Sequence, residues 1–442
     1  MNSHSVRHFV SIAAICLALF LSGISGLLSS SESGEFGILR WVIVGCMFVG
    51  ACCFAASMML EATDRRFFPI YLGGFMMVAT QATSFLLAGT FARIDHGRFF
   101  ETIVQQILVV CWIGFGMTTD WRGPSIWFLT TLAGLGIMTA NVGLWIQIGF
   151  PVPFEGLSTG KNGLAAAACS GIVLAATMLL YWRNFISFLG AGALGGISCI
   201  ALLASGGRAS ILFLAIALFA YACWPLYRWS RIGPTLLIIG MIVLLAAIPI
   251  LYVNLDQFSW FQYFDGEFAK LTHSTFSGRE TLWPEVIQGI SDHPIVGNGT
   301  SASWRFVRKE YGIVQELSAH NLYLAVLYQS GLIGLIGISW LFASFLYTYW
   351  KMPDSRWARI GFAIFMAALF REVWEVSLTQ NTLQIGLGVW VLATLGISLG
   401  SMHDSAEEEH EDAEDEEPNS DSDSDYEEEE FDKDFHLLPD PS

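Results

Sequence analysis

Long apolar runs alternate with short polar segments along most of the chain. A helix needs about 20 apolar residues to cross the hydrocarbon core of a bilayer. We therefore expect each sufficiently long run to form a transmembrane helix. Twelve such runs are present, at about 8–28, 38–60, 68–90, 101–118, 125–149, 163–182, 185–204, 209–225, 235–253, 319–347, 357–377 and 382–401. This pattern predicts an all-α integral membrane protein with about 12 transmembrane helices.

The composition supports the membrane class and shows that the C-terminal end differs from the rest of the chain. Hydrophobic residues make up 54% of the chain and charged residues only 14%, which is too apolar for an ordinary soluble globule. The net charge of −17 comes from residues 402–442, which hold 20 Asp and Glu against one Lys and leave the rest of the chain near +2. We expect a membrane domain over 1–401 and a disordered acidic tail over 402–442. The membrane domain has no basic patch large enough to predict a nucleic-acid partner.

Lysine and arginine in the short loops predict how the chain is oriented. One set of loops contains ten of these residues and the opposite set contains six. The side with more positive charge is normally cytoplasmic. Both termini, and with them the acidic tail, are then cytoplasmic, and the long loop 254–318 is outside. The run 9–28 lacks a signal-peptide cleavage site, so we interpret it as a retained first helix.

Cysteine and carboxylate spacings favour neither metal nor redox chemistry. All eight cysteines lie in apolar runs, and no C-x-x-C pair occurs. No carboxylate cluster has the spacing of a metal site. We therefore expect no metal site and no cofactor.

The outer loop 254–318 concentrates the polar chemistry of the chain. Ser277-Gly278-Arg279-Glu280, followed by spaced apolar residues, is typical of the capped start of an amphipathic helix. Asp292-His293-Pro294 should end that helix, and Gly297-Asn298-Gly299 should form a turn. We expect short helices along the outer membrane surface.

The predicted topology brings four charged or imidazole side chains to the outer face. Arg208 precedes the eighth span, Arg279 lies in the loop, and His320 opens the tenth span. Arg371 falls in the outer half of the eleventh span, with Glu375 four residues later on the same helix face. Converging guanidinium groups suit a phosphate-rich anion, and a neighbouring histidine can act as a general base on a hydroxyl.

Each of these residues also has a structural alternative. Arg208 would then be an interfacial residue that reaches toward water, and Arg279 a solvated loop charge. His320 would only cap its helix, and Arg371 would pair with Glu372 or Glu375.

Several short motifs occur together in a specific order. They are Gly160-Lys161-Asn162-Gly163, Ser205-x2-Arg208, Ser277-Gly278-Arg279-x3-Trp283, His293-Pro294-Ile295-x-Gly297-x-Gly299, Ala319-His320-Asn321-Leu322-Tyr323-Leu324 and Gly331-Leu332-Ile333-Gly334. In this order, over about residues 155–345, the chain resembles the O-antigen ligase and polymerase family. The first 150 residues share with that family only the series of apolar spans, and the acidic tail departs from its pattern.

The resemblance implies a GT-C-like, metal-independent, inverting glycosyltransferase of the bacterial inner membrane. Its donor would be a glycan on undecaprenyl pyrophosphate, and its acceptor a lipid or glycan hydroxyl at the periplasmic face. Carried over by position, Arg208 and Arg279 would hold the pyrophosphate and His320 would activate the acceptor. Asn321 and Arg371 are further candidate substrate-binding residues, although the family gives no clear position for Arg371.

Two other functions compete with this hypothesis. A transporter or flippase for an anion or lipid-linked sugar would be expected to show internal repeats, broken helices and charges near the midplane. No internal repeat is evident in the sequence, and most spans lack central charges. A non-catalytic scaffold for envelope assembly would tolerate substitutions in the outer-face cluster.

Overall fold

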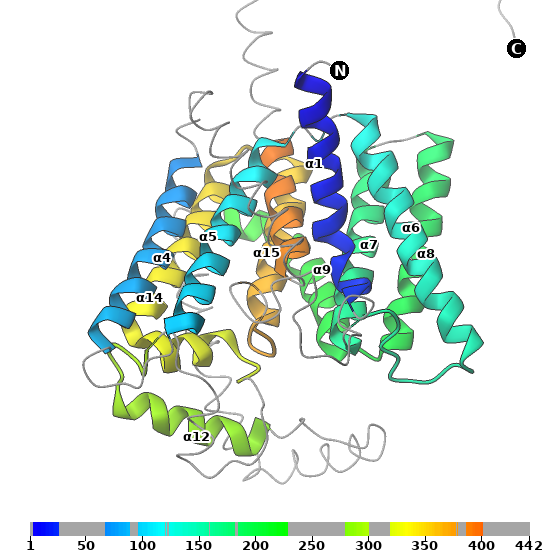
Figure 1. The fold of residues 1–442 in the computed structure, drawn as a ribbon. Helices are drawn as coiled ribbons and strands as arrows, with labels where there is room; N and C mark the ends of the chain where they lie inside the picture. Colours follow the sequence, from blue (N-terminus) through cyan, green and yellow to red (C-terminus); the bar gives the residue numbers. More distant parts are fainter. Residues whose placement is uncertain are drawn as a thin grey trace, which may run out of the picture. The chain divides into compact units, whose positions relative to one another are not determined.

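A computed structural model of the 442-residue chain describes residues 3–25, 67–88, 96–119, 121, 123–158, 160–181, 184–228, 279–299, 319–376, 378 and 386–400. Within these residues the secondary structure is helical, with no strand (Figure 1). The helices are α1 (Ser3–Phe20) with the short 3-10 turn η1 (Leu21–Gly23), α4 (Phe68–Ala88), α5 (His96–Thr118), α6 (Pro124–Gln147), α7 (Lys161–Tyr181), α8 (Phe185–Ser205), α9 (Arg208–Arg228), α12 (Arg279–Asp292), α14 (Leu322–Lys351), α15 (Arg356–Arg371) and an apolar helix at Gly386–Gly400.

Six of these helices are long and apolar enough to cross a membrane: α4, α6, α7, α8, α9 and α14. The protein is thus a multi-pass membrane protein that is all-α over its described residues, as its hydropathy predicted. Shorter apolar helices cover Ile12–Gly23, Thr102–Met117 and Gly386–Gly400. The predicted spans at 38–60 and 235–253 lie outside the described residues, as does the acidic tail. The total of about 12 spans and the GT-C-like fold remain predictions.

Helix α7 forms part of the core of the bundle. In its apolar window 78% of residues are buried, against 22% for α9. Small residues let its neighbours approach closely, since a side chain at Gly171 would overlap Ser198 of α8. Close backbone approach through small residues is the usual way in which membrane helices pack, because lipid tails provide no hydrophobic force between them. In the first turn of α7, a side chain at Gly163 would overlap Ser158, so this turn is also closely packed.

Helix α14 is two helices joined at Gly331, where the sequence predicted one continuous span. Gly331 has φ 58° and ψ −157°, a conformation that essentially only glycine adopts. A side chain there would also overlap the backbone of Ile295. The break leaves backbone groups without helical partners, and in an apolar setting these must be satisfied elsewhere.

The segment 293–299 supplies the missing partners. The backbone N–H of Leu332 donates to the carbonyl oxygen of Pro294 at 2.9 Å, and the N–H of Asn298 donates to the carbonyl of Tyr328 at 2.9 Å. The Asn298 side chain adds a second bond to the Tyr328 carbonyl at 3.2 Å. The two glycine motifs of the sequence thus form one structural unit.

Candidate functional site

His320 occupies a tight turn in front of α14. Its φ is +47°, which places it in the left-handed region that few residues other than glycine adopt. The helix begins at Leu322, capped by the Asn321 side chain, whose oxygen accepts from the N–H of Leu324 at 2.9 Å. His320 therefore precedes the helix, whereas the sequence had placed it in the first turn. The capping role considered for His320 is performed by Asn321.

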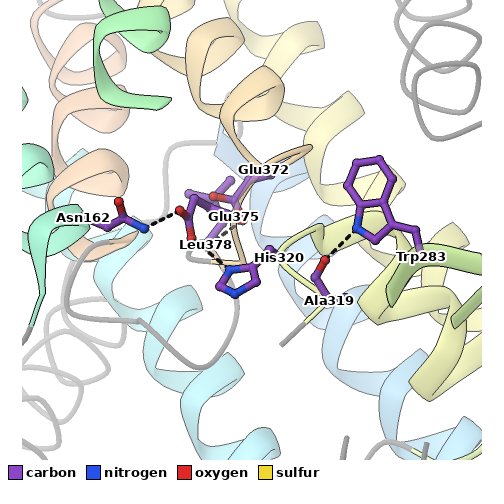
Figure 2. A network of polar contacts seen from close by, with 7 residues as sticks. All are labelled: Asn162, Trp283, Ala319, His320, Glu372, Glu375 and Leu378. Atoms are coloured by element: carbon purple, nitrogen blue, oxygen red, sulfur yellow. Dashed lines mark hydrogen bonds and ion pairs between the residues drawn. The ribbon is translucent and has the colours of Figure 1, made fainter. Parts of the chain in front are cut away.

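Neighbouring segments hold this turn from both sides. The indole N–H of Trp283 in α12 donates to the Ala319 carbonyl at 2.9 Å (Figure 2). On the other side, the N–H of Leu322 donates to the Glu372 carbonyl at 2.8 Å. A non-glycine residue held at positive φ costs on the order of 1–3 kcal/mol and persists only where its surroundings over-determine it. Such strain often marks a functional position.

The side chain of His320 faces a carboxylate. Its Nδ1 lies 3.8 Å from Oε2 of Glu375, and the two side chains are 32% and 10% exposed. The other oxygen of Glu375, Oε1, accepts from the Asn162 amide at 2.7 Å. Figure 2 shows Asn162 and His320 approaching the same carboxylate from two different elements. The three residues form what we call the His320–Glu375–Asn162 group.

The expected relation between Arg371 and Glu375 is not formed. Helix α15 ends at Arg371, so the two residues do not share a helix face. Glu375 instead pairs with His320 and Asn162. Arg371 is only 5% exposed, and its Nε has no hydrogen-bond partner in the part of the chain that the structure describes. Burying a guanidinium without full pairing is costly, which keeps Arg371 a candidate for binding an anion.

Asn321, the other candidate substrate-binding residue, is fully buried. Its side-chain oxygen is committed to the helix cap. Its Nδ2 has no hydrogen-bond partner among the described segments. Only this donor is left for a ligand.

Helix α12 confirms the amphipathic helix predicted in the outer loop. It begins at Arg279, and Leu282, Trp283 and Val286 are buried. The indole of Trp283 also stacks on Trp374, with ring centroids 6.0 Å apart and an interplanar angle of 24°. One side chain of α12 thus contacts both the segment that carries His320 and the one that carries Glu375.

Arg279 begins the helix that contacts the His320 turn. It is the first residue of α12, four positions and about one helical turn before Trp283. Trp283 bonds to Ala319, the residue before His320, and so connects α12 to the histidine turn. The side chain of Arg279 lies outside what the structure describes.

The residue before Arg208 packs on α7, the helix that carries Asn162. Arg208 is the first residue of α9, and its side chain is exposed. The preceding Gly207 packs so closely against Ala165 that a side chain there would overlap it. Ala165 lies three residues after Asn162, which is about one turn along the same face of α7.

Sequence reasoning missed the carboxylate partner of His320. Glu375 was noticed only through its spacing from Arg371, and Asn162 only as part of a motif. Glu372, which holds the loop after α15 by accepting from the N–H of Leu378 at 3.2 Å, was considered only as a partner for Arg371. Glu372 and Glu375, which follow Arg371, were the available signal for a polar site. The end of α15 at Arg371 could not be located, because the apolar pattern continues past it.

Comparison with protein families bears on the class of function. Residues 193–339 match the family model described as O-antigen ligase. This part of the chain carries an O-antigen ligase signature. The resemblance predicted from the motifs is confirmed for this segment, which includes Arg208, Arg279 and His320 and covers about a third of the chain. A search of curated proteins gave no match.

The O-antigen ligase match indicates glycan transfer in a membrane. It ends before α15, so Arg371 and Glu375 lie beyond it, and Asn162 lies before it. The His320–Glu375–Asn162 group is therefore built from one residue inside the matched segment and two outside.

Proposed function

We propose that the protein transfers a glycan from an undecaprenyl-pyrophosphate carrier to an acceptor hydroxyl, as an O-antigen ligase or polysaccharide polymerase does. The acceptor is a lipid or another glycan. The reaction takes place at the periplasmic face of the bacterial inner membrane, with both termini in the cytoplasm. The family match and the strained, carboxylate-paired His320 support this proposal.

His320 acts as the general base in this reaction. It removes the proton of the acceptor hydroxyl while the hydroxyl oxygen attacks the anomeric carbon. The bond from that carbon to the pyrophosphate oxygen breaks, and its electron pair leaves with the pyrophosphate. Attack from the side opposite to the leaving group inverts the configuration.

Arg208 and Arg279 bind the pyrophosphate in this proposal. Pyrophosphate is a good leaving group, so its developing charge is the main electrostatic demand of the reaction. Guanidinium groups can meet this demand without a metal, because their paired N–H groups match phosphate oxygens. Arg371 and the Nδ2 of Asn321 provide further contacts to the substrate.

The single observation that carries the proposal is the contact network around His320. It connects the histidine to the start of α12 through Trp283 and to the start of α7 through Glu375 and Asn162. Arg279 begins α12 four residues before Trp283, and Arg208 begins α9 directly after Gly207, which packs against Ala165 of α7.

A transporter or flippase remains the alternative, and the break in α14 is the one feature that favours it. Broken helices of transporters expose backbone groups to ions or substrates. Here Leu332 and Tyr328, on the two sides of the break, bond to the segment 293–299. A break filled by the protein's own backbone favours a structural role.

The decisive experiment is glycan transfer in vitro with purified protein and a lipid-linked glycan donor. We expect His320→Ala and Arg279→Ala each to reduce transfer by about 100-fold or more. His293→Ala, which changes a histidine in the segment packed on α14, is the matched control and should retain transfer. Wild-type transfer by both His320→Ala and Arg279→Ala would overturn the assignment of the site residues, and no transfer by the unaltered protein would overturn the proposed function. Flux of the lipid-linked sugar across proteoliposomes without an acceptor would support the transporter instead.

A further inference from the structure

We propose that Glu375 is a positioning residue that orients His320 and stabilises its positive charge, and that Asn162 holds Glu375 in place. This inference rests on the proposed function, in which His320 takes a proton. It adds Glu375 and Asn162 to the proposed site, and both lie outside the segment that matches the O-antigen ligase family. The carboxylate of Glu375 contacts both His320 and Asn162.

The two oxygens of Glu375 have separate partners. Oε1 accepts a hydrogen bond of 2.7 Å from the Asn162 amide, while Oε2 faces Nδ1 of His320 at 3.8 Å. Asn162 sits in the first turn of α7, whose apolar window is 78% buried. The carboxylate is thus tied to a fixed element of the bundle, and the half-buried imidazole is the more exposed partner.

In the proposal this arrangement selects the ring nitrogen that reacts. Nδ1 faces the carboxylate at 3.8 Å, which is an ion-pair contact that would tighten to a hydrogen bond when the acceptor binds, so that Nδ1 carries the proton in the neutral imidazole. Nε2 then presents its lone pair on the opposite side of the ring. Nε2 is the atom that takes the proton from the acceptor hydroxyl.

Glu375 also acts on His320 during the reaction, when the ring becomes positively charged. When Nε2 receives the proton, the ring becomes an imidazolium directly beside a carboxylate. The carboxylate, 3.8 Å from Nδ1, offsets part of this positive charge. The proton later leaves Nε2 for water, and the carboxylate itself is not protonated in the cycle.

The backbone around the group explains why such a partner is needed. His320 lies at φ +47° between Ala319 and Asn321, whose positions are fixed by Trp283 and by the helix cap. These contacts hold the backbone, whereas Glu375 contacts the imidazole itself. In the proposal this contact fixes the orientation of the ring.

The test is steady-state transfer by Glu375→Gln, Glu375→Asp and Asn162→Ala in full-length protein, with a purified undecaprenyl-pyrophosphate-linked glycan as the probe. We expect Glu375→Gln to lower kcat on the order of 100-fold or more, while KM for the donor stays within about twofold. Glu375→Asp keeps the charge and should recover part of the lost kcat. Asn162→Ala should lower kcat about tenfold, since it frees the carboxylate without removing it.

Two matched controls separate positioning from general damage. Glu155→Gln changes an exposed glutamate in the α6–α7 connection, and Asn184→Ala removes a side-chain acceptor from the N-cap of α8. Both should retain wild-type kcat. Equal loss of kcat in Asn184→Ala and Asn162→Ala would overturn the role of Asn162.

The failure of this inference is distinguishable from the failure of the proposed function. If Glu375→Gln keeps wild-type kcat while His320→Ala is inactive, the positioning role is wrong and the proposed function stands. If the unaltered protein transfers no glycan, the proposed function is wrong, and normal transfer by His320→Ala would remove His320 from the role of general base. Should Glu375→Gln not accumulate in the membrane, Asn162→Ala and Glu375→Asp decide, and wild-type kcat in both would overturn the inference.

Discussion

The indole nitrogen of Trp283 donates a 2.9 Å hydrogen bond to the carbonyl oxygen of Ala319, 36 residues further along the chain. Through this bond helix α12 fixes the residue that precedes His320. The same indole stacks on Trp374, which precedes Glu375. Helix α12 therefore helps to set the distance between the histidine and its carboxylate.

Replacing the Trp283 indole should lower the transfer rate of each folded molecule, in addition to destabilising the fold. Trp283→Phe removes the N–H donor and leaves the buried Ala319 carbonyl without its partner, at a cost of about 1–3 kcal/mol. We expect glycan transfer per folded molecule to fall about tenfold, because the His320 turn loses one of its anchors. The measurement is transfer rate normalised to monodisperse protein in detergent. Trp127→Phe is the control, since it removes a comparable indole hydrogen bond, of 2.6 Å to the Trp121 carbonyl, that does not involve the His320–Glu375–Asn162 group. Equal losses of transfer in both variants would contradict the prediction.

The break in α14 should depend on glycine. Gly331→Ala puts a side chain at φ 58°, ψ −157°, where it overlaps the backbone of Ile295. We expect a loss of about 3 kcal/mol or more of folding stability, seen as a lower thermal unfolding temperature in detergent. Gly192→Ala is the matched control, because a side chain there meets nothing within 4 Å on helix α8. That variant should be neutral or up to about 1 kcal/mol more stable, and normal stability of Gly331→Ala would contradict the prediction.

Replacing Arg371 should lower transfer activity without lowering folding stability. Arg371→Met keeps a long side chain but removes a charge that is 95% buried and whose Nε has no hydrogen-bond partner in the described chain. Replacing buried charge by apolar volume is often neutral or stabilising. We therefore expect an unchanged or higher unfolding temperature together with transfer reduced by about tenfold or more. Full transfer activity in Arg371→Met would remove Arg371 from the substrate site.

The predicted orientation is tested by cysteine labelling in cells with a permeabilised outer membrane. Ser291→Cys, at the exposed end of α12, should react with a membrane-impermeant maleimide. Lys351→Cys, at the exposed far end of α14, should react only after the inner membrane is opened. Labelling relative to the parent protein corrects for its own cysteines. The reverse pattern would place α12 in the cytoplasm and exclude periplasmic chemistry.

The apolar pattern predicted the membrane class and most of the described helices, because a span of about 20 residues is a local property. It also predicted α12, whose start at Arg279 and apolar face follow from residue spacing. It did not predict the break at Gly331. That break depends on the distant segment 293–299, which replaces the helical hydrogen bonds.

The candidate site was predicted in its residue types more than in its pairings. His320 was singled out as an imidazole at a span boundary, and the structure adds its left-handed backbone and its carboxylate. The partner Glu375 was assigned to Arg371, because a continuous helix puts residues four apart on one face. Helix α15 stops at Arg371, so the assignment failed at a helix end. Asn162 contacts Glu375 from 213 residues away, a proximity that no local pattern reveals.

The break at Gly331 affects how deep His320 would lie in the membrane. The twenty residues from Leu332 to Lys351 rise by about 30 Å, enough to traverse the hydrocarbon layer by themselves. The short helix before the break, and the histidine in front of it, are then left at the level of the lipid headgroups. A carrier lipid keeps its diphosphate at that same level. Under the proposed function, sugar transfer would need no lifting of the polyprenyl chain out of the bilayer.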